Sequence, residues 1–179
     1  AIRTAKREII IANAYFFPGV RFRHALAAAA RRGVKVTLLL QARVEYRLLH
    51  YASRALYGQL LEAGVAIAEY HRSFLHAKVA VIDDHWATVG SSNIDPYSLL
   101  MAREANVFVR DAHFADALRA ELVAMIGDGA RPVDPKRWGI LHLGSAEDAA
   151  PTAPVTALEG DGSPVANQKR ALADLEGII

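Results

Sequence analysis

Along the first half of the chain, short apolar runs typical of strands alternate with segments typical of helices. Continuous apolar runs rich in branched residues predict three buried β-strands, at residues 8–13, 34–40 and 65–70. Two helices are predicted between them, at residues 21–32 and 46–63, and a glycine follows each one. A strand–helix–strand order with short connections favours parallel strands joined by helices.

The pattern changes in the second half of the chain. It predicts three further strands and one helix: strands at 76–83, 86–90 and 104–109, and a helix at 114–126 that the glycines of 127–129 end. Asp83-Asp84-His85 predicts a tight turn between two of these strands, because aspartate is common in turns. The predicted fold class is α/β, with a mixed, mainly parallel sheet flanked by helices.

Composition divides the chain at about residue 143. Residues 1–143 carry all the predicted elements and are expected to form one domain. Residues 144–179 are rich in Pro, Gly, Ala, Ser and Thr, and we expect a flexible C-terminal tail there. No apolar run reaches the length of a transmembrane helix and no signal peptide is visible. Since the chain starts with Ala1, we expect it to begin inside a longer gene product.

The charge distribution and the absence of cysteine limit the possible partners and the possible kinds of site. The net charge of +2 hides an asymmetry, because residues 1–60 hold eleven Lys or Arg and two acidic residues. A basic half suits an anionic partner such as phospholipid, nucleic acid or a phosphate ester, or it is a solvated surface with no partner. The absence of cysteine excludes a disulfide framework, a cysteine-ligated zinc site and a cysteine nucleophile.

One pattern carries chemistry: His76 and Lys78 stand two residues apart in a predicted strand. Alternate residues of a strand share a face, so the imidazole and the ammonium lie side by side. Both are costly to bury without partners, and the pair therefore needs an explanation. Lys78, Asn93 and Ser91 can donate to anionic phosphate oxygens, and Gly90 lets backbone approach a ligand closely.

Glu104 and Asn106 repeat this spacing on a later predicted strand. If that strand lies near the strand of His76, Glu104 accepts a hydrogen bond from Nδ1 of His76. The Nε2 lone pair then stays free, as a nucleophilic imidazole requires.

These residues resemble the HxKxxxxD(x6)GSxN signature of the phospholipase D superfamily. The matching positions are His76, Lys78, Asp83, Gly90, Ser91 and Asn93. The stretches 12–18, 30–36 and 83–96 resemble the C-terminal half of bacterial cardiolipin synthases, those of type B in particular, and the similarity extends from about Ala5 to Asp111.

The resemblance implies a mechanism with a phosphohistidine intermediate. In such enzymes one histidine attacks phosphorus, and a second, across a pseudo-two-fold interface, protonates the leaving alcohol. Carried over by motif, the catalytic residues are His76, Lys78, Asp83 and Glu104, and the phosphate-binding residues are Lys78, Ser91 and Asn93. Asp83 lies seven residues from His76, at the opposite strand parity, so we expect it to have a supporting role. The resemblance implies no cofactor and no metal.

The chain contains a single HxK motif. Lysine does not follow two residues after any other histidine: His24, His50, His71, His85, His113 or His142. The resemblance therefore implies a second half-site, from a missing N-terminal half or from a homodimer partner. It also implies an anionic phospholipid substrate, a membrane surface as partner, and a location peripheral to the bacterial inner membrane on its cytoplasmic side. Nucleic acid is not an expected partner.

Two other functions stay open. The chain can be a phosphodiesterase or nuclease that acts as a homodimer with one motif per chain, or a non-catalytic module that binds anionic lipid. The aromatic run Tyr15-Phe16-Phe17 either lines a pocket for acyl or glycerol groups or belongs to the core.

Overall fold

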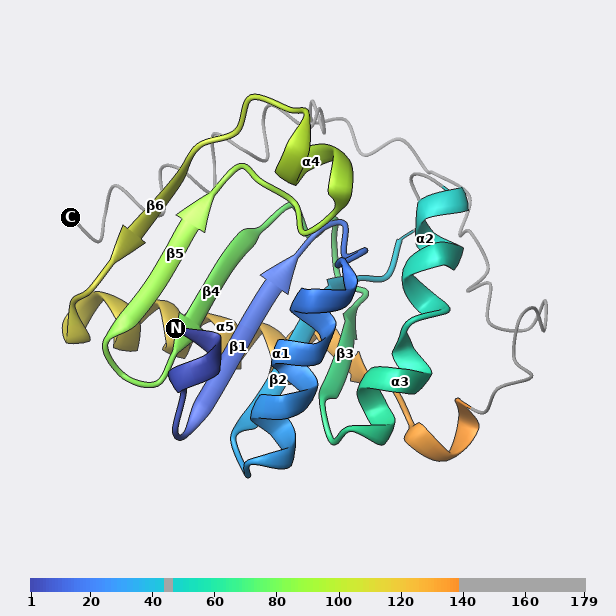
Figure 1. The fold of residues 1–179 in the computed structure, drawn as a ribbon, viewed down its shortest axis with the longest axis horizontal. Helices are drawn as coiled ribbons and strands as arrows, with labels where there is room; N and C mark the ends of the chain where they lie inside the picture. Colours follow the sequence, from blue (N-terminus) through green and yellow to red (C-terminus); the bar gives the residue numbers. More distant parts are fainter. Residues whose placement is uncertain (44–46, 139–179) are drawn as a thin grey trace. The chain divides into compact units, whose positions relative to one another are not determined.

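The structure is a computed structural model that describes residues 1–43 and 47–138 (Figure 1). Within these residues the strands are β1 (Glu8–Asn13), β2 (Lys35–Gln41), β3 (Ala66–Tyr70), β4 (Lys78–Ile82), β5 (Trp86–Gly90), β6 (Asn106–Val109) and β7 (Ala130–Pro132). The helices are α1 (Val20–Arg31), α2 (Arg47–Arg54), α3 (Tyr57–Glu62), α4 (Pro96–Leu100) and α5 (Ala112–Gly129), with short 3-10 turns η1 (Ile2–Thr4) and η2 (Pro135–Arg137). The expected tail, residues 144–179, and the boundary before it lie outside the described residues.

The strands form one mixed sheet in the order β6-β5-β4-β1-β2-β3-β7. The class α/β and the mixed sheet with flanking helices are confirmed. The expectation of a mainly parallel sheet is wrong, since β1–β2 and β2–β3 are parallel and the other four described pairings are antiparallel. The reason is the connection type. Helices α1, α2 and α3 join the parallel strands, whereas a short turn joins β4 to β5 and reverses the chain.

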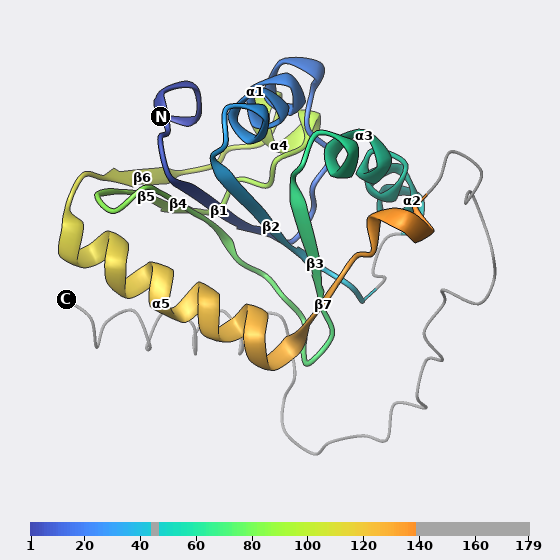
Figure 2. The same ribbon diagram turned by 90° about the horizontal axis from the view of Figure 1, so that it is seen from below.

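Helices cover the sheet on both faces, as Figure 2 shows. Helices α1 and α3 lie on one face, here called the α1 face, and α5 crosses the other, the α5 face. Along β1 the side chains alternate: Ile9 and Ile11 pack toward α1 and α3, while Ile10 and Ala12 pack toward α5. Because both faces of β1 are buried, its sequence is a continuous apolar run.

Several element boundaries differ from the sequence expectation. The helix expected at 46–63 is two helices, because Leu56 donates its N–H to the Ser53 carbonyl in a tighter i→i−3 turn that separates α2 from α3. Helix α5 continues to Gly129, where a side chain would collide with the Tyr70 ring, so this glycine permits close packing and does not stop the helix early. Strands β4 and β6 each begin two residues later than expected, at Lys78 and Asn106.

Candidate active site

A row of polar residues crosses four strands at one end of the sheet. Asn13 of β1 pairs with Lys78 of β4. The next pair along, Val79 with Val89, places Lys78 level with Gly90 of β5. Gly90 in turn pairs with Asn106 of β6. Paired residues point to the same face of a sheet, and Ala80, two residues after Lys78, packs in the core on the α1 face. The row therefore lies on that face.

Lys78 is the buried charge of the row, with 9% of the residue exposed. Its Nζ donates a hydrogen bond to the backbone carbonyl of His76 at 3.0 Å. His76 itself is exposed and precedes β4, so it lies at the rim of the sheet. The backbone between them stays close to β1, because Ala14 donates its N–H to the Ala77 carbonyl at 3.0 Å. The lysine and the histidine of the motif thus lie together at the N-terminal end of β4.

Ser91 connects the end of β5 to the residues before β6. Its Oγ donates a short hydrogen bond to Glu104 and accepts one from the N–H of Ala105 at 3.0 Å. Its backbone N–H donates to the Ala105 carbonyl at 3.0 Å. Since the serine side chain replaces a backbone partner here, the regular ladder of β6 starts only at Asn106. Strand β5 lies between β4 and β6, and Ser91 is a hydrogen-bond partner of Glu104 at the end of β5.

Two asparagines hold the loop that carries Asn93. The Oδ1 of Asn13 accepts the N–H of Ile94 at 3.1 Å, and the Oδ1 of Asn106 accepts the N–H of Ser92 at 3.4 Å. Asn93 Oδ1 is buried and receives no hydrogen bond from the described residues. The sequence analysis did not identify Asn13 as a residue that holds this loop. A polar residue at the end of an apolar strand could have indicated it, because Asn13 is only 2% exposed and a buried amide needs a hydrogen-bond partner.

Gly90 is required by a neighbouring side chain. A Cβ at this position would collide with the side-chain oxygen of Asn106 and would lie 2.6 Å from the Ala105 carbonyl. The sequence suggested that Gly90 allows close approach to a ligand. In the structure the group that approaches is Asn106 of the neighbouring strand.

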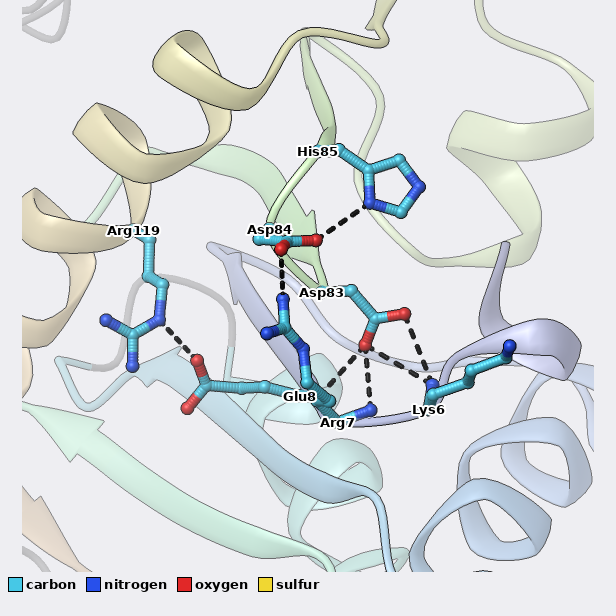
Figure 3. A network of polar contacts seen from close by, with 7 residues as sticks. All are labelled: Lys6, Arg7, Glu8, Asp83, Asp84, His85 and Arg119. Atoms are coloured by element: carbon cyan, nitrogen blue, oxygen red, sulfur yellow. Dashed lines mark hydrogen bonds and ion pairs between the residues drawn. The ribbon is translucent and has the colours of Figure 1, made fainter.

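Asp83 lies at the other end of β4 from Lys78, in the contacts of Figure 3. The extended chain from Lys78 to Asp83 separates their backbones by about 16 Å, at roughly 3.3 Å per residue. The Asp83 carboxylate accepts the backbone N–H groups of Lys6, Arg7 and Glu8, the closest from Arg7 at 2.8 Å. Burial alone would raise the pKa of Asp83, but these hydrogen bonds outweigh it and lower the pKa below its ordinary value. Its backbone has φ of 55°, a left-handed conformation that aspartate tolerates. These contacts agree with a supporting role for Asp83, and the structure does not bring it to the other predicted site residues.

The same end of the sheet carries further ion pairs (Figure 3). Arg7 pairs with Asp84, and the His85 ring lies against the same carboxylate, so the pKa of Asp84 falls to about 2. Glu8 pairs with Arg119 of α5 at 2.5 Å and with Lys35 at 3.2 Å. Burial opposes ionisation of Glu8, yet these two partners hold the pKa of Glu8 below its ordinary value. Ion pairs and carboxylate hydrogen bonds thus connect the elements at this end of the sheet, and Lys78 and Ser91 of the predicted site lie at the opposite end.

The aromatic run after β1 divides between core and surface. Phe16 is buried in the core on the α1 face and forms a bridge with Ile94, whereas Tyr15 and Phe17 are half-buried. The core interpretation therefore holds for Phe16. Asp95 also has a structural role that the sequence did not reveal: its carboxylate accepts the N–H and the hydroxyl of Ser98, each at 2.9 Å, and so caps α4.

Comparisons with known proteins identify relatives of this arrangement. A family model described as "Cardiolipin synthase, PLD-like domain" matches residues 1–126. Cardiolipin synthase B of Escherichia coli K12 is 52% identical over 142 residues, which cover 76% of this chain and 34% of that protein. A cardiolipin synthase of Geobacillus thermodenitrificans is 43% identical over 108 residues, covering 60% of this chain and 22% of that protein. The chain spans about a third or less of the length of these relatives.

Solved structures share the fold. Nuc of Salmonella typhimurium, a phospholipase D family member, has a TM-score of 0.64 and 25% identity, covering 74% of this chain and 86% of that one. A phosphatidylserine synthase of Haemophilus influenzae has a TM-score of 0.60 at 12% identity, covering 97% of this chain and 40% of that one, a likeness of fold alone. In the part of the chain that the structure describes, no helix is long and apolar enough to cross a membrane.

Proposed function

The chain belongs to the family of cardiolipin synthase, phospholipase D-like domains, and from that membership we propose that it is one catalytic half of a phosphatidyltransferase. The proposed reaction moves a phosphatidyl group from one phosphatidylglycerol to a hydroxyl of another and makes cardiolipin. The half-domain comprises residues 1–143. The identity of 52% to cardiolipin synthase B favours this substrate class.

The observation that carries the proposal is a buried lysine whose ammonium contacts the backbone of the exposed motif histidine. Lys78 is 9% exposed and its Nζ reaches the His76 carbonyl at 3.0 Å. A buried cation is costly, and at the rim of a sheet it is well placed to meet an anionic phosphoryl group. The hydroxyl of Ser91 and the amide of Asn93 stand in the loop that follows Gly90, at the same end of the sheet.

The proposed steps give each group one task. Nε2 of His76 attacks phosphorus and the first alcohol leaves, so that a phosphohistidine forms. A histidine of a second HxK half-site donates a proton to that alcohol and then takes one from the incoming hydroxyl, which attacks phosphorus and releases His76. Lys78, Ser91 and Asn93 donate hydrogen bonds to the phosphoryl oxygens, and Glu104 orients the imidazole of His76. His76 is either the nucleophile or the acid–base partner, because this chain supplies one of the two half-sites that the reaction needs.

The proposed setting is the surface of an anionic membrane. The substrate is a phospholipid, so the protein acts as a peripheral protein at the bacterial inner membrane, on its cytoplasmic side. Nucleic acid is not a proposed partner.

The test uses the chain assembled with a second HxK half-site, in an assembly that makes cardiolipin from phosphatidylglycerol vesicles, and measures cardiolipin by mass spectrometry. We expect His76→Ala to lower turnover by about 10³-fold or more, since it removes the nucleophile or its acid–base partner. His113→Ala is the matched control, because His113 is an exposed histidine on α5 away from the site. Turnover in His76→Ala equal to that of the control would overturn the proposal.

A phosphodiesterase is the second candidate, and the likeness to Nuc favours it because this chain covers 86% of that protein. Its test is cleavage of a chromogenic phosphodiester and of plasmid DNA by the same two variants. Cleavage that depends on His76, without cardiolipin formation, would select this second function.

A further inference from the structure

The row of residues that holds Asn13 and Lys78 continues across the sheet beyond β1. Asn13 pairs with Leu40 of β2, and Leu40 pairs with Glu69 of β3. Glu69 pairs in turn with Arg131 of β7. Since Leu40 packs in the core on the α1 face, Glu69 and Arg131 point to that face. Three strand spacings separate β4 from β3, about 14 Å at roughly 4.8 Å each, so Lys78 and Glu69 mark two separate places along one row.

Positive charges surround His71 at the second of these places. Helix α2, beside α3 in Figure 2, brings Arg54 over the sheet, and Arg54 Nε lies 3.7 Å from the Glu69 carboxylate. His71 follows β3 directly, two residues after Glu69 and on the same face. Burial lowers the pKa of His71, and so do the charges of Arg131, Arg54 and Arg43, which Glu69 opposes only in part. The imidazole of His71 therefore lies in a positive field.

The three arginines, here called the arginine cluster, outnumber the acidic group beside them. The cluster consists of Arg43, Arg54 and Arg131. Three guanidinium groups against the one carboxylate of Glu69 leave an excess of two positive charges. Arginine keeps its charge throughout the pH range in which proteins fold, so loss of protons does not relieve the repulsion. A bound anion does.

Aromatic rings hold two members of the cluster in place. Arg43 Nη2 donates to the Arg72 carbonyl at 3.2 Å, and the Arg43 guanidinium lies 5.2 Å from the centre of the Phe74 ring. The Arg54 guanidinium lies 4.6 Å from the centre of the Trp138 ring. A ring face orients a guanidinium without accepting its in-plane N–H groups, whereas a carboxylate occupies them. The arrangement therefore fixes the arginines and leaves N–H donors for the oxygens of a ligand.

We propose that the arginine cluster is a second anion subsite, which binds a phosphate group beside the candidate site. Guanidinium groups bind phosphate oxygens through paired N–H donors. The cluster stands at the C-terminal ends of β2 and β3, and ligands bind outside these ends in sheets with parallel strands. The subsite goes beyond the phosphoryl transfer assigned to His76 and Lys78, because it holds a further phosphate. That phosphate belongs to a phospholipid headgroup or is free in solution.

NMR titration of the histidines tests the subsite, because two histidines report the two places separately. The pH titration is run on the wild-type chain with and without inorganic phosphate, and it follows His71 at the cluster and His76 at the candidate site. A bound phosphate offsets the arginine charges, so we expect the measured pKa of His71 to rise by about one pH unit. A His71 pKa that phosphate leaves unchanged would overturn the proposal, whether or not His76 responds.

Three arginine variants identify the donors. Arg43→Gln and Arg131→Gln each remove one exposed guanidinium of the cluster, and we expect each to raise the phosphate Kd, measured through His71, by about ten-fold. Arg31→Gln is the matched control. It removes the same charge from an exposed arginine in the last turn of α1, at the other end of the sheet, and it should leave the Kd within about two-fold. Equal weakening in all three variants would contradict a built subsite and would show a general effect of charge.

Co-sedimentation with phosphatidylglycerol vesicles distinguishes the two sources of the phosphate. A headgroup as ligand predicts that Arg43→Gln and Arg131→Gln weaken vesicle binding relative to Arg31→Gln, and that inorganic phosphate competes with the vesicles. Free phosphate as ligand predicts equal vesicle binding by the three variants, while His71 still responds to inorganic phosphate. No measurement here uses cardiolipin formation. Failure of the subsite therefore leaves the proposed transferase standing, and an assembly that makes no cardiolipin leaves the subsite standing.

Discussion

At the scale of single residues, the motif lysine and the motif aspartate have opposite roles. Lys78 is a buried cation at the end of β4 that follows the exposed His76. Asp83 accepts three backbone N–H groups at the other end of the same strand. Strand parity in the sequence already predicted a supporting role for Asp83, but it did not predict the partners of its carboxylate. The structure adds that Lys78 and Asp83 lie at opposite ends of β4.

Replacing Lys78 by methionine keeps the side-chain volume and removes the charge. We expect turnover to fall by about 10²- to 10³-fold, the usual effect of losing one group that stabilises developing charge. The melting temperature should fall by only a few degrees, because the substitution removes the desolvation cost of the buried ammonium as well as its hydrogen bond to the His76 carbonyl. Cardiolipin formation and the melting temperature are measured together, with Lys6→Met as the control at an exposed lysine. A melting temperature that drops in parallel with activity would contradict a catalytic role.

Two substitutions of Asp83 separate its hydrogen bonds from its charge. We expect Asp83→Ala to lower the free energy of unfolding by about 1–2 kcal/mol, as for the loss of a side-chain cap. Asp83→Asn keeps an acceptor oxygen and tolerates φ of 55°, so it should retain most of the stability near neutral pH. Denaturant unfolding of both variants makes the comparison. Equal losses in the two would show that the charge and not the acceptor geometry matters.

At the scale of elements, the continuous apolar runs predicted strands well and the polar ends of those strands poorly. The bounds of β1 and β5 match the expectation residue for residue. The later starts of β4 and β6 could not be predicted, because they depend on tertiary contacts: Ser91 substitutes for a strand partner of Ala105, and the chain before Lys78 belongs to a loop. Likewise, the motif in the sequence identified the candidate residues but not their contacts. Ser91 and Glu104 form a hydrogen bond because β5 and β6 are adjacent in the sheet.

The junction of β5 and β6 gives a prediction at this scale. We expect Gly90→Ala to lower the free energy of unfolding by about 1–3 kcal/mol, because its methyl group collides with Asn106 and with the Ala105 backbone. Gly127→Ala is the opposite control. It lies inside α5 with no atom within 4 Å of an added Cβ, so alanine should stabilise by up to about 1 kcal/mol. Chemical denaturation measures both. A neutral Gly90→Ala would mean that the two strands separate easily at the site.

At the scale of the whole molecule, the two ends of the sheet are built differently. One end carries the polar row and a loop held by asparagines, and the other is fastened by Asp83 and by Glu8, which pairs with Arg119 of α5 and with Lys35 of β2. Glu8 thus joins the N-terminal strand to the helix on the α5 face.

This division predicts how stability depends on pH. The pKa values of Glu8 and Asp83 are lower in the folded chain than their ordinary values of 4.5 and 3.8. A carboxylate with a lowered folded pKa stabilises the fold above its ordinary pKa, and that stability is lost as pH falls through the folded value. We therefore expect the stability that Glu8 and Asp83 contribute to be fully present at neutral pH and to be lost below about pH 4.5. Glu8→Gln and Asp83→Asn should each flatten part of this fall. Urea unfolding from pH 7 to pH 3 measures the profile, and a fall that persists undiminished in the double variant Glu8→Gln/Asp83→Asn would place the acid-sensitive contacts elsewhere.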